Sequence, residues 1–218
     1  MTTEAEDTRG YRRGRVKRAE ILDAALAAFA EVGYLEASMR DIAAAVGLTQ
    51  PGLLHHFPSK KALLSAVLEH SEELDAAKLS LNWVSRGGRV PEVAELIEGM
   101  VRLVSLNQTR PALIELFATL SAEATWPAHP AHAYFVDRYE RLLGETTAIL
   151  TDYERGGRLR PGLRPADAAR IIIAAMDGLQ IQWLLERDAP ERVDMAAVLR
   201  TTLESLLAGS VTETPTPA

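Results

Sequence analysis

Glycine and proline divide this chain into helix-length segments, and none of the segments carries the apolar–polar alternation of a strand. In the first segment apolar residues recur at steps of three or four, as in Leu22, Ala25 and Phe29. The same pattern predicts helices over 15–32, 39–46, 50–56, 59–82, 91–108, 111–124, 131–155, 166–186 and 193–208. The sequence therefore predicts an all-α protein, with a small N-terminal unit of three helices joined to a larger bundle.

Basic residues gather near the N-terminus of a chain whose net charge is −6. Residues 9–18 hold six Lys and Arg side chains and no acid, so the rest of the chain is more acidic than the total indicates. A basic arm on an acidic body favours an anionic partner at one end only. A solvated basic tail is the alternative.

Cysteine is absent from the sequence, which excludes a disulfide framework, a Cys-ligated metal site and a thiol nucleophile. The longest charge-free stretch, 42–59, is interrupted by Pro51, two histidines and Pro58, so it is not a transmembrane helix. The N-terminus shows acidic residues and no apolar leader. We expect a cytoplasmic protein without a membrane partner.

Residues 38–60, SMRDIAAAVGLTQPGLLHHFPSK, carry the most informative motif. Ser38 and Asp41 form an S-x-x-D capping box at a helix start. Gly47 can take the left-handed conformation that ends that helix, and Thr49 can cap the next one, where Pro51 costs little. Two short helices joined by a Gly-containing turn predict a helix-turn-helix, whose second helix can enter the major groove of DNA. An ordinary corner between two helices is the alternative.

This segment resembles the N-terminal DNA-binding domain of the TetR-type (tetracycline-repressor-like) transcriptional regulators. The resemblance covers about residues 15–65, where ILDAALAAFAEVGYLEASMRDIAAAVGLT is followed by HFPSKKALL. It implies a DNA-binding domain ahead of a helical ligand-binding and dimerisation domain. We expect a flexible basic arm over 1–14, a helix-turn-helix domain over 15–58, the helical body over 59–208 and a disordered tail over 209–218.

Gln50 is the side chain of the second helix best suited to bidentate hydrogen bonds with adenine. Pro51 and Gly52 favour contact with a thymine methyl group or close backbone approach. The family usually has a tyrosine, often a phosphate contact, where this chain has Leu54, and His55 partly replaces it. The resemblance implies further contacts to phosphates or groove edges from Ser38, Arg40, Thr49 and Lys60, and from the arm residues Arg12, Arg13, Arg15 and Arg18. We expect Phe57 to belong to the core.

The segment 166–186 is apolar almost all round, so it needs burial on more than one face. We expect one face to pack on its own bundle and another on a second subunit, beside the helix at 193–208. The residues predicted at this dimer interface are Ile172, Gly178, Trp183, Leu199 and Leu206. A central core helix in a monomer is the alternative.

Most aromatic and methionine side chains lie in the middle of the chain, mixed with a few polar groups, as in a small-molecule pocket. The residues predicted to bind such a molecule are Met100, Val104, Asn107, Phe117, Trp126, Tyr139, Met176 and Gln180. The same composition describes a packed core without a cavity. We expect an uncharged or weakly charged, largely apolar effector, and no cofactor or metal, because His129-x-x-His132 lacks an acidic third ligand.

Together these patterns predict a homodimeric regulator, a repressor that binds a palindromic operator in double-stranded DNA and is released by a small molecule. A helical enzyme is one alternative, but the sequence contains no nucleophile elbow, phosphate loop or H-E-x-x-H motif. A dimeric adaptor, in which the helix-turn-helix contacts protein instead of DNA, is the other.

Overall fold

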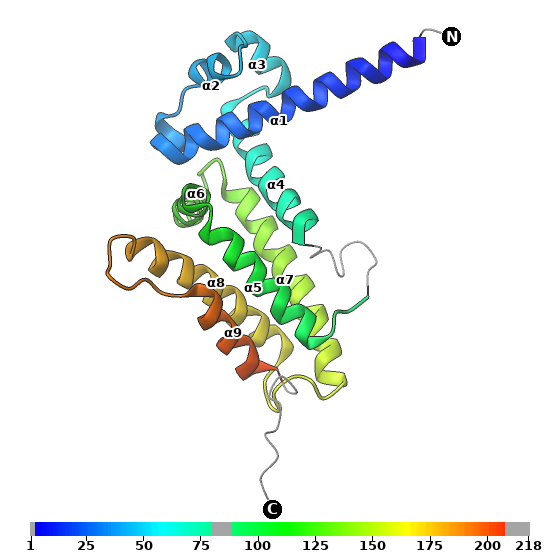
Figure 1. Cartoon of the computed structure of the whole chain (residues 1–218), viewed down its shortest axis with the longest axis vertical. Coiled ribbons are helices and arrows are strands. Elements are labelled where there is room, and N and C mark those ends of the chain that lie inside the picture. Colours follow the sequence, from blue (N-terminus) through cyan, green and yellow to red (C-terminus); the bar gives the residue numbers. More distant parts are fainter. Residues whose placement is uncertain (1–2, 80–88, 208–218) are drawn as a thin grey trace, which may run out of the picture.

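The computed structural model describes residues 3–79 and 89–207, and this part of the chain forms nine α-helices (Figure 1). They are α1 (Thr3–Glu36), α2 (Met39–Ala45), α3 (Gln50–His56), α4 (Lys60–Leu79), α5 (Val93–Gln108), α6 (Pro111–Glu123), α7 (His132–Arg155), α8 (Pro165–Leu185) and α9 (Met195–Leu206). The all-α prediction is confirmed. The expected end of the fourth helix at 80–82, the segment 83–88 that follows it, and the tail lie outside the described residues.

Helix α1 is longer than the sequence predicts, because its backbone is helical through the stretch expected to be a flexible arm. Gly33, with φ of 81°, interrupts the helix near its C-terminal end, close to the predicted stop. Figure 1 shows the N-terminal half of α1 projecting beyond the rest of the fold.

A first hydrophobic cluster, the N-terminal core, joins α1, α2, α3 and the first half of α4. Phe29, Leu53 and Leu64 are buried at its centre. Leu116 of α6 and Phe135 of α7 belong to the same cluster. The expected domain boundary at 58/59 therefore falls between two helices, α3 and α4, that share one hydrophobic core.

A second cluster, the C-terminal core, joins α5, the end of α7, α8 and α9. Ile97, Leu150, Ile172 and Leu199 are buried in it, one from each of the four helices. The turn after α7 returns to the end of α9, where the Arg160 N–H donates to Leu206 O at 2.9 Å. These helices form the body that carries the N-terminal unit.

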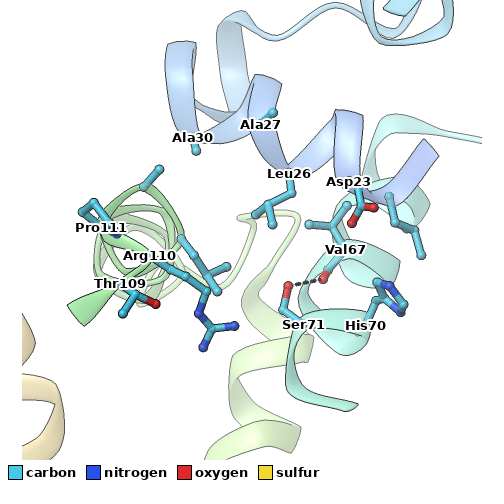
Figure 2. Close-up of a pocket in the computed structure, with 13 residues that line it drawn as sticks. Asp23, Leu26, Ala27, Ala30, Val67, His70, Ser71, Thr109, Arg110 and Pro111 are labelled. Carbon is cyan, nitrogen blue, oxygen red and sulfur yellow. Dashed lines mark hydrogen bonds between the residues drawn. The ribbon is translucent and has the colours of Figure 1, made fainter. Parts of the chain in front are cut away.

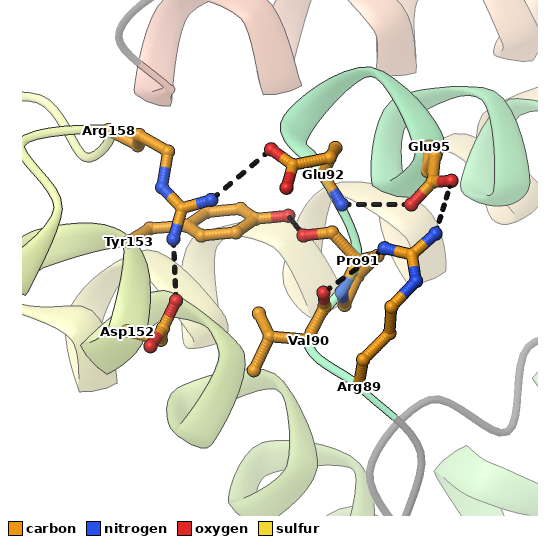
Figure 3. Close-up of polar contacts among 8 residues, drawn as sticks. All are labelled: Arg89, Val90, Pro91, Glu92, Glu95, Asp152, Tyr153 and Arg158. Atoms are coloured by element: carbon orange, nitrogen blue, oxygen red, sulfur yellow. Dashed lines mark hydrogen bonds and ion pairs between the residues drawn. The ribbon is translucent and has the colours of Figure 1, made fainter.

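Tyr153 fastens the start of α5 to the end of α7 (Figure 3). Its ring is fully buried, and its hydroxyl donates a hydrogen bond to Pro91 O at 2.8 Å. Arg158 covers the ring, with its guanidinium 4.7 Å from the ring centroid, and contacts Glu92 and Asp152. Burial raises the pKa of Tyr153, so the hydroxyl keeps its proton and remains a donor.

Replacing Tyr153 by Phe removes only this donor and leaves the buried Pro91 carbonyl without it. We expect Tyr153→Phe to lower the free energy of unfolding by about 1–3 kcal/mol, measured by urea denaturation. Thr125→Ala, which removes an exposed hydroxyl bonded within its own turn to Ala122 O, is the control, with an effect below about 0.5 kcal/mol. Equal effects of the two substitutions would contradict a role for Tyr153 as a fastening.

By length and composition, α8 is the one helix in the described ranges that could cross a membrane, with a mean hydropathy of 1.2. A core helix of a globular protein passes the same test, and α8 packs on α7 and α9 along one face. Only 28% of its most apolar window is buried within the chain. Much of its apolar surface therefore needs another partner.

Candidate nucleic-acid interface

The turn between α2 and α3 has the geometry that the motif predicts. Gly47 has a φ of 70°, the left-handed region, and the Leu48 N–H donates to Ala43 O at 2.9 Å. Thr49 Oγ1 caps α3 by accepting a hydrogen bond from the Gly52 N–H at 3.2 Å. Pro51 lies in the first helical turn, where its missing N–H costs nothing. The helix-turn-helix prediction is confirmed in its backbone.

Ser38 stands at the N-cap of α2, but the predicted capping box does not form, because its side chain makes no capping hydrogen bond. Asp41 lies instead beside Arg40, with Oδ1 3.4 Å from Nε. An exposed carboxylate next to an exposed guanidinium gains from that contact and gives up the reciprocal cap. The side chain of Arg40 remains 79% exposed.

Helix α3 has one buried and one exposed face. Leu53 is buried in the N-terminal core, as is Phe57, which follows the helix as predicted. Gln50, Pro51, Leu54 and His55 are exposed. Because these positions are one or four residues apart, they share one side of the helix. The structure therefore brings together, on one outward surface, most of the α3 residues that the sequence predicts for DNA contact.

Two basic side chains of α1 hold the helix-turn-helix in place. Lys17 Nζ donates to Val46 O, the C-cap of α2, at 2.7 Å, and lies 2.8 Å from Glu20 Oε2. The Arg18 guanidinium lies 4.3 Å from the centroid of the Phe57 ring. Its predicted contact with the DNA backbone or an adjacent groove stays a prediction. Sequence reasoning missed Lys17, because its position in the run 9–18 gave no sign of an internal acceptor.

Lys60, predicted to contact a DNA phosphate, makes contacts within the protein, and its contact with DNA stays a prediction. Its ammonium donates to Leu35 O at 2.8 Å and lies 4.8 Å from the centroid of the Tyr34 ring. A cation at the end of α1 satisfies a carbonyl that has no partner within the helix. Burial lowers the pKa of Lys60, and Glu36 opposes that change. Lys60 therefore joins α4 to α1.

The backbones of Arg12, Arg13 and Arg15 lie in the projecting half of α1, and their side chains lie outside the described part of the structure. Their predicted contacts with DNA stay predictions. A helix that projects from the N-terminal unit can carry such side chains away from the body and along a neighbouring groove (Figure 1).

Four of the five residues predicted at the dimer interface lie in the interior of this chain. Ile172, Trp183, Leu199 and Leu206 are buried within their own chain, and the ring of Trp183 is covered by the Arg192 guanidinium at 3.3 Å. These four predictions are corrected, because the helices α5, α7, α8 and α9 already use that face. Gly178 is the exception, since a Cβ placed there would meet nothing within 4 Å.

The outward face of α8 carries a stripe of apolar and small side chains, of which sequence reasoning identified only Gly178. We call it the α8 stripe, and it consists of Ile171, Ala174, Gly178, Ile181 and Leu185. These residues recur at steps of three or four, as a helix–helix seam requires. Leu185 is 81% exposed, and Val198 of α9 is a further large apolar side chain on the surface.

The residues predicted for the effector are not gathered around one described cavity. Phe117 and Tyr139 pack against the N-terminal core, whereas Met100, Val104 and Met176 belong to or pack against the C-terminal core. Trp126 is 67% exposed, which corrects its placement in a pocket wall; it lies in the turn after α6, where few residues cover it.

Two of the predicted polar groups make hydrogen bonds inside the protein. Asn107 is buried and its Oδ1 accepts from Arg110 Nη2 at 2.9 Å. Tyr139 donates to Asp177 Oδ2 at 2.8 Å, and burial raises the pKa of Tyr139 to about 12. Gln180 lies half-buried on α8.

The two histidines that the sequence analysis rejected as a metal site, His129 and His132, take part in the turn between α6 and α7. His129 Nδ1 accepts from the Ala131 N–H at 3.2 Å, and His132 Nδ1 lies 2.7 Å from Ala124 O. Within the described ranges, no group of three His, Asp or Glu side chains is placed to hold a metal ion. The histidines therefore have structural partners.

Two family models match the chain. The model described as bacterial regulatory proteins, tetR family, matches residues 21–67, which include α2, α3 and the start of α4. The model described as BetI-type transcriptional repressor, C-terminal, matches residues 93–208, from the start of α5 to the end of α9. The first match lies in the N-terminal unit, and the second covers the helices α5 to α9 of the body.

Relatives with assigned names cover nearly the whole chain. The HTH-type transcriptional repressor Rv1474c of Mycobacterium tuberculosis is 28% identical over 186 residues, 84% of this chain and 89% of its own. The HTH-type transcriptional regulator UidR of Escherichia coli is 26% identical over 213 residues, 96% and 98% of the two chains.

Solved structures agree with this likeness. GusR of Salmonella enterica is 26% identical, with a TM-score of 0.67 over 88% of this chain and 95% of its own. NalD, the secondary repressor of the MexAB-OprM multidrug efflux pump in Pseudomonas aeruginosa, has a TM-score of 0.70 at 22% identity, covering 92% and 100% of the two chains. At that identity the second likeness shows the fold alone.

Proposed function

This chain belongs to the tetR family of bacterial regulatory proteins, with a BetI-type C-terminal region, and we propose that it acts as a homodimeric repressor whose hold on DNA is relieved by a small molecule. Members of this family are DNA-binding transcriptional regulators. The proposed place of action is the cytoplasm, where the DNA of a bacterium lies.

The exposed surface of α3 is the observation that carries the DNA-binding part of this proposal. Gln50 stands at the first position of α3 with its side chain exposed, beside the exposed Thr49 and Pro51. The opposite face is held by Leu53 and Phe57 in the N-terminal core. A rigidly mounted helix with a bidentate amide at its N-terminal end suits the reading of base edges in the major groove.

The α8 stripe supports the dimer. A symmetric pair would bring the same surface of α8 from each subunit together, with Gly178 allowing close approach of the two backbones. The two α3 helices of such a dimer would read half-sites about 34–36 Å apart, or further apart if extra base pairs separate them. A palindromic operator follows from that symmetry.

DNA selection tests the proposal directly. The purified protein would be incubated with sheared DNA that includes the region upstream of its own gene, and the retained fragments would be sequenced. We expect one motif with two-fold symmetry, confirmed by gel shift. Retained fragments without such symmetry, or no specific retention, would contradict a dimeric repressor and favour an adaptor role.

Gln50 is expected to discriminate at a single base-pair position in each half-site. Gln50→Ala should cost about 1–3 kcal/mol on the native operator and much less on operators altered at that base pair. Gel-shift affinities for a panel of single-base variants would measure this. Gln108→Ala, at the end of α5, is the control and should leave the whole panel unchanged. A uniform loss across the panel would show that Gln50 contacts phosphate and reads no base.

A further inference from the structure

A pocket of about 510 Å³ lies where α1, α4 and the connection from α5 to α6 meet (Figure 2). The volume is in the usual range for small-molecule sites, roughly 300–1,000 Å³. None of the eight residues that the sequence predicts for an effector lines this pocket. The pocket is therefore a candidate site separate from the predicted one.

The wall of this pocket is mostly apolar. Leucine and valine side chains from three helices form much of it, namely Leu22, Leu26, Val67 and Leu113. Figure 2 shows Ala27 and Ala30 beside Leu26 along α1. A charge that moves from water into such surroundings is costly unless it finds an opposite charge, so the wall favours an uncharged molecule.

An acid and an arginine also line the pocket. Asp23 is exposed to solvent, where water screens its charge. The Arg110 guanidinium is engaged within the protein, where its Nη2 donates to the buried Asn107 Oδ1 at 2.9 Å. The polar contact with a bound molecule therefore falls to a neutral group of the wall.

Ser71 of α4 is a neutral polar group of the wall that is buried, with 6% of its surface exposed. Figure 2 shows it across the pocket from Leu26. Its hydroxyl donates to Val67 O at 3.0 Å, so its only proton is used, and the lone pairs that remain on Oγ can only accept. Among the described residues no donor is hydrogen-bonded to this Oγ. A molecule that completes the hydrogen bonds of Ser71 must therefore present a donor.

We propose that this pocket binds a small apolar alcohol or phenol, whose hydroxyl donates to Ser71 Oγ and whose apolar body lies against α1. The pocket unites two parts of the protein: α1 and α4 belong to the N-terminal unit, and residues 109–113 lead into the body helix α6. A molecule bound there favours the relative placement of the two parts that keeps the pocket open.

The regulatory consequence rests on the proposed DNA-binding function. If DNA requires a different placement of the N-terminal unit on the body, the alcohol and the operator bind in competition, by the same factor in each direction. Binding of the alcohol itself does not depend on DNA, so the two statements can be tested separately.

The first probes are 2-naphthylmethanol and its methyl ether, which share a ring system and differ in the hydroxyl proton. Calorimetric titration of the whole DNA-free protein should show that the alcohol binds roughly three- to tenfold more tightly, as one hydrogen bond allows. Ser71→Ala should remove this preference. Ser105→Ala is the matched control, because Ser105 on α5 makes the same kind of bond, to Val101 O at 2.9 Å, outside the pocket wall. That variant should keep the preference.

A second set of titrations tests the place and the charge of the ligand. Ala30→Phe fills the α1 side of the pocket and should abolish binding of both probes. Ala122→Phe, on the exposed surface of α6 and outside the pocket wall, is its control and should bind as the native protein does. The charged analogues 2-naphthoate and protonated 2-naphthylmethylamine should each bind at least about tenfold more weakly than the alcohol.

Each part of the proposal has its own contrary result. No binding of 2-naphthylmethanol at about 1 mM, or binding that survives Ala30→Phe in a protein with native melting behaviour, overturns the site. Equal affinities for alcohol and ether, or a preference that survives Ser71→Ala, overturn the contact with Ser71. A charged analogue that binds as tightly as the alcohol overturns the choice of an uncharged ligand.

The coupling to DNA is measured separately, by gel shift in saturating 2-naphthylmethanol. Operator binding should be weaker than without the alcohol, and an unchanged affinity overturns the coupling alone. Failure of the native protein to bind any palindrome contradicts the proposed function and leaves the pocket result standing.

Discussion

Ile181→Glu is expected to convert the dimer into a monomer and to abolish operator binding at concentrations where the native protein is saturated. Ile181 lies on the exposed α8 stripe, between Gly178 and Leu185. In a symmetric dimer the substitution places two carboxylates in one dry seam, and an unpaired buried charge costs about 3–5 kcal/mol. Dimerisation should weaken by at least about 100-fold, because each 1.4 kcal/mol is a factor of ten.

Light scattering over a concentration series and gel shift on the selected operator would measure the two effects of Ile181→Glu. Val32→Glu makes the same chemical change at a comparably exposed β-branched residue of α1, and this control should remain dimeric. Circular dichroism should show native helix content in both. A dimer that persists in Ile181→Glu, or is lost equally in Val32→Glu, would place the interface elsewhere.

Phe57→Ala is expected to destabilise the N-terminal unit strongly, because Phe57 is a large side chain buried where α3 ends. Phe57 is buried, its N–H closes α3 by donating to Leu53 O at 2.9 Å, and Arg18 covers its ring. Truncation of a buried phenylalanine costs about 3–5 kcal/mol, from lost burial and the cavity left behind. Helix α3 is then no longer held against the N-terminal core. Operator affinity should therefore fall even at temperatures where α8 and α9 remain folded.

Leu54→Ala is the matched control for Phe57→Ala, because Leu54 also belongs to the recognition helix segment but is exposed. Its effect on the free energy of unfolding should stay within about 0.5 kcal/mol. Thermal denaturation followed by circular dichroism measures both variants. If Phe57→Ala unfolds no earlier than Leu54→Ala, the contacts of Phe57 do not hold the recognition helix.

The helix pattern was largely predictable because proline, glycine and capping residues mark helix ends locally. Thr49 caps α3 as its position predicts, Ser59 caps the first turn of α4 in the same way, and Pro111 and Pro165 open α6 and α8. These signals act within one turn of the chain, so neighbouring residues suffice to recognise them. The outward residues of α3 were predictable for the same reason, since the buried Leu53 fixes the phase of the helix.

The inward face of α8 and the contacts of Lys60 and Arg18 within the protein depend on residues that are distant in the sequence, so the helical pattern alone could not show them. The run Ile171-Ile172-Ile173 offers no polar residue to show which isoleucine faces inward, and packing against α7 and α9 chooses Ile172. The contacts of Lys60 and Arg18 are also determined by groups that are distant in the sequence. The acceptor of Lys60, Leu35 O, is about 25 residues away along the chain, and the ring that Arg18 covers, that of Phe57, is about 39 residues away. Only the folded arrangement brings these groups together.

The N-terminal core extends from the N-terminal unit into the body, since Leu116, Leu120 and Phe135 complete it from α6 and α7. A fragment ending after α4 would lack these three side chains. The apolar residues of α1 to α4 that pack against them would then be exposed to water. The N-terminal unit could therefore not be transferred to another protein without changes to its core. Amide protons of α1 and α6 should exchange with solvent together, as one cooperative unit, because opening either helix dismantles the interior of both.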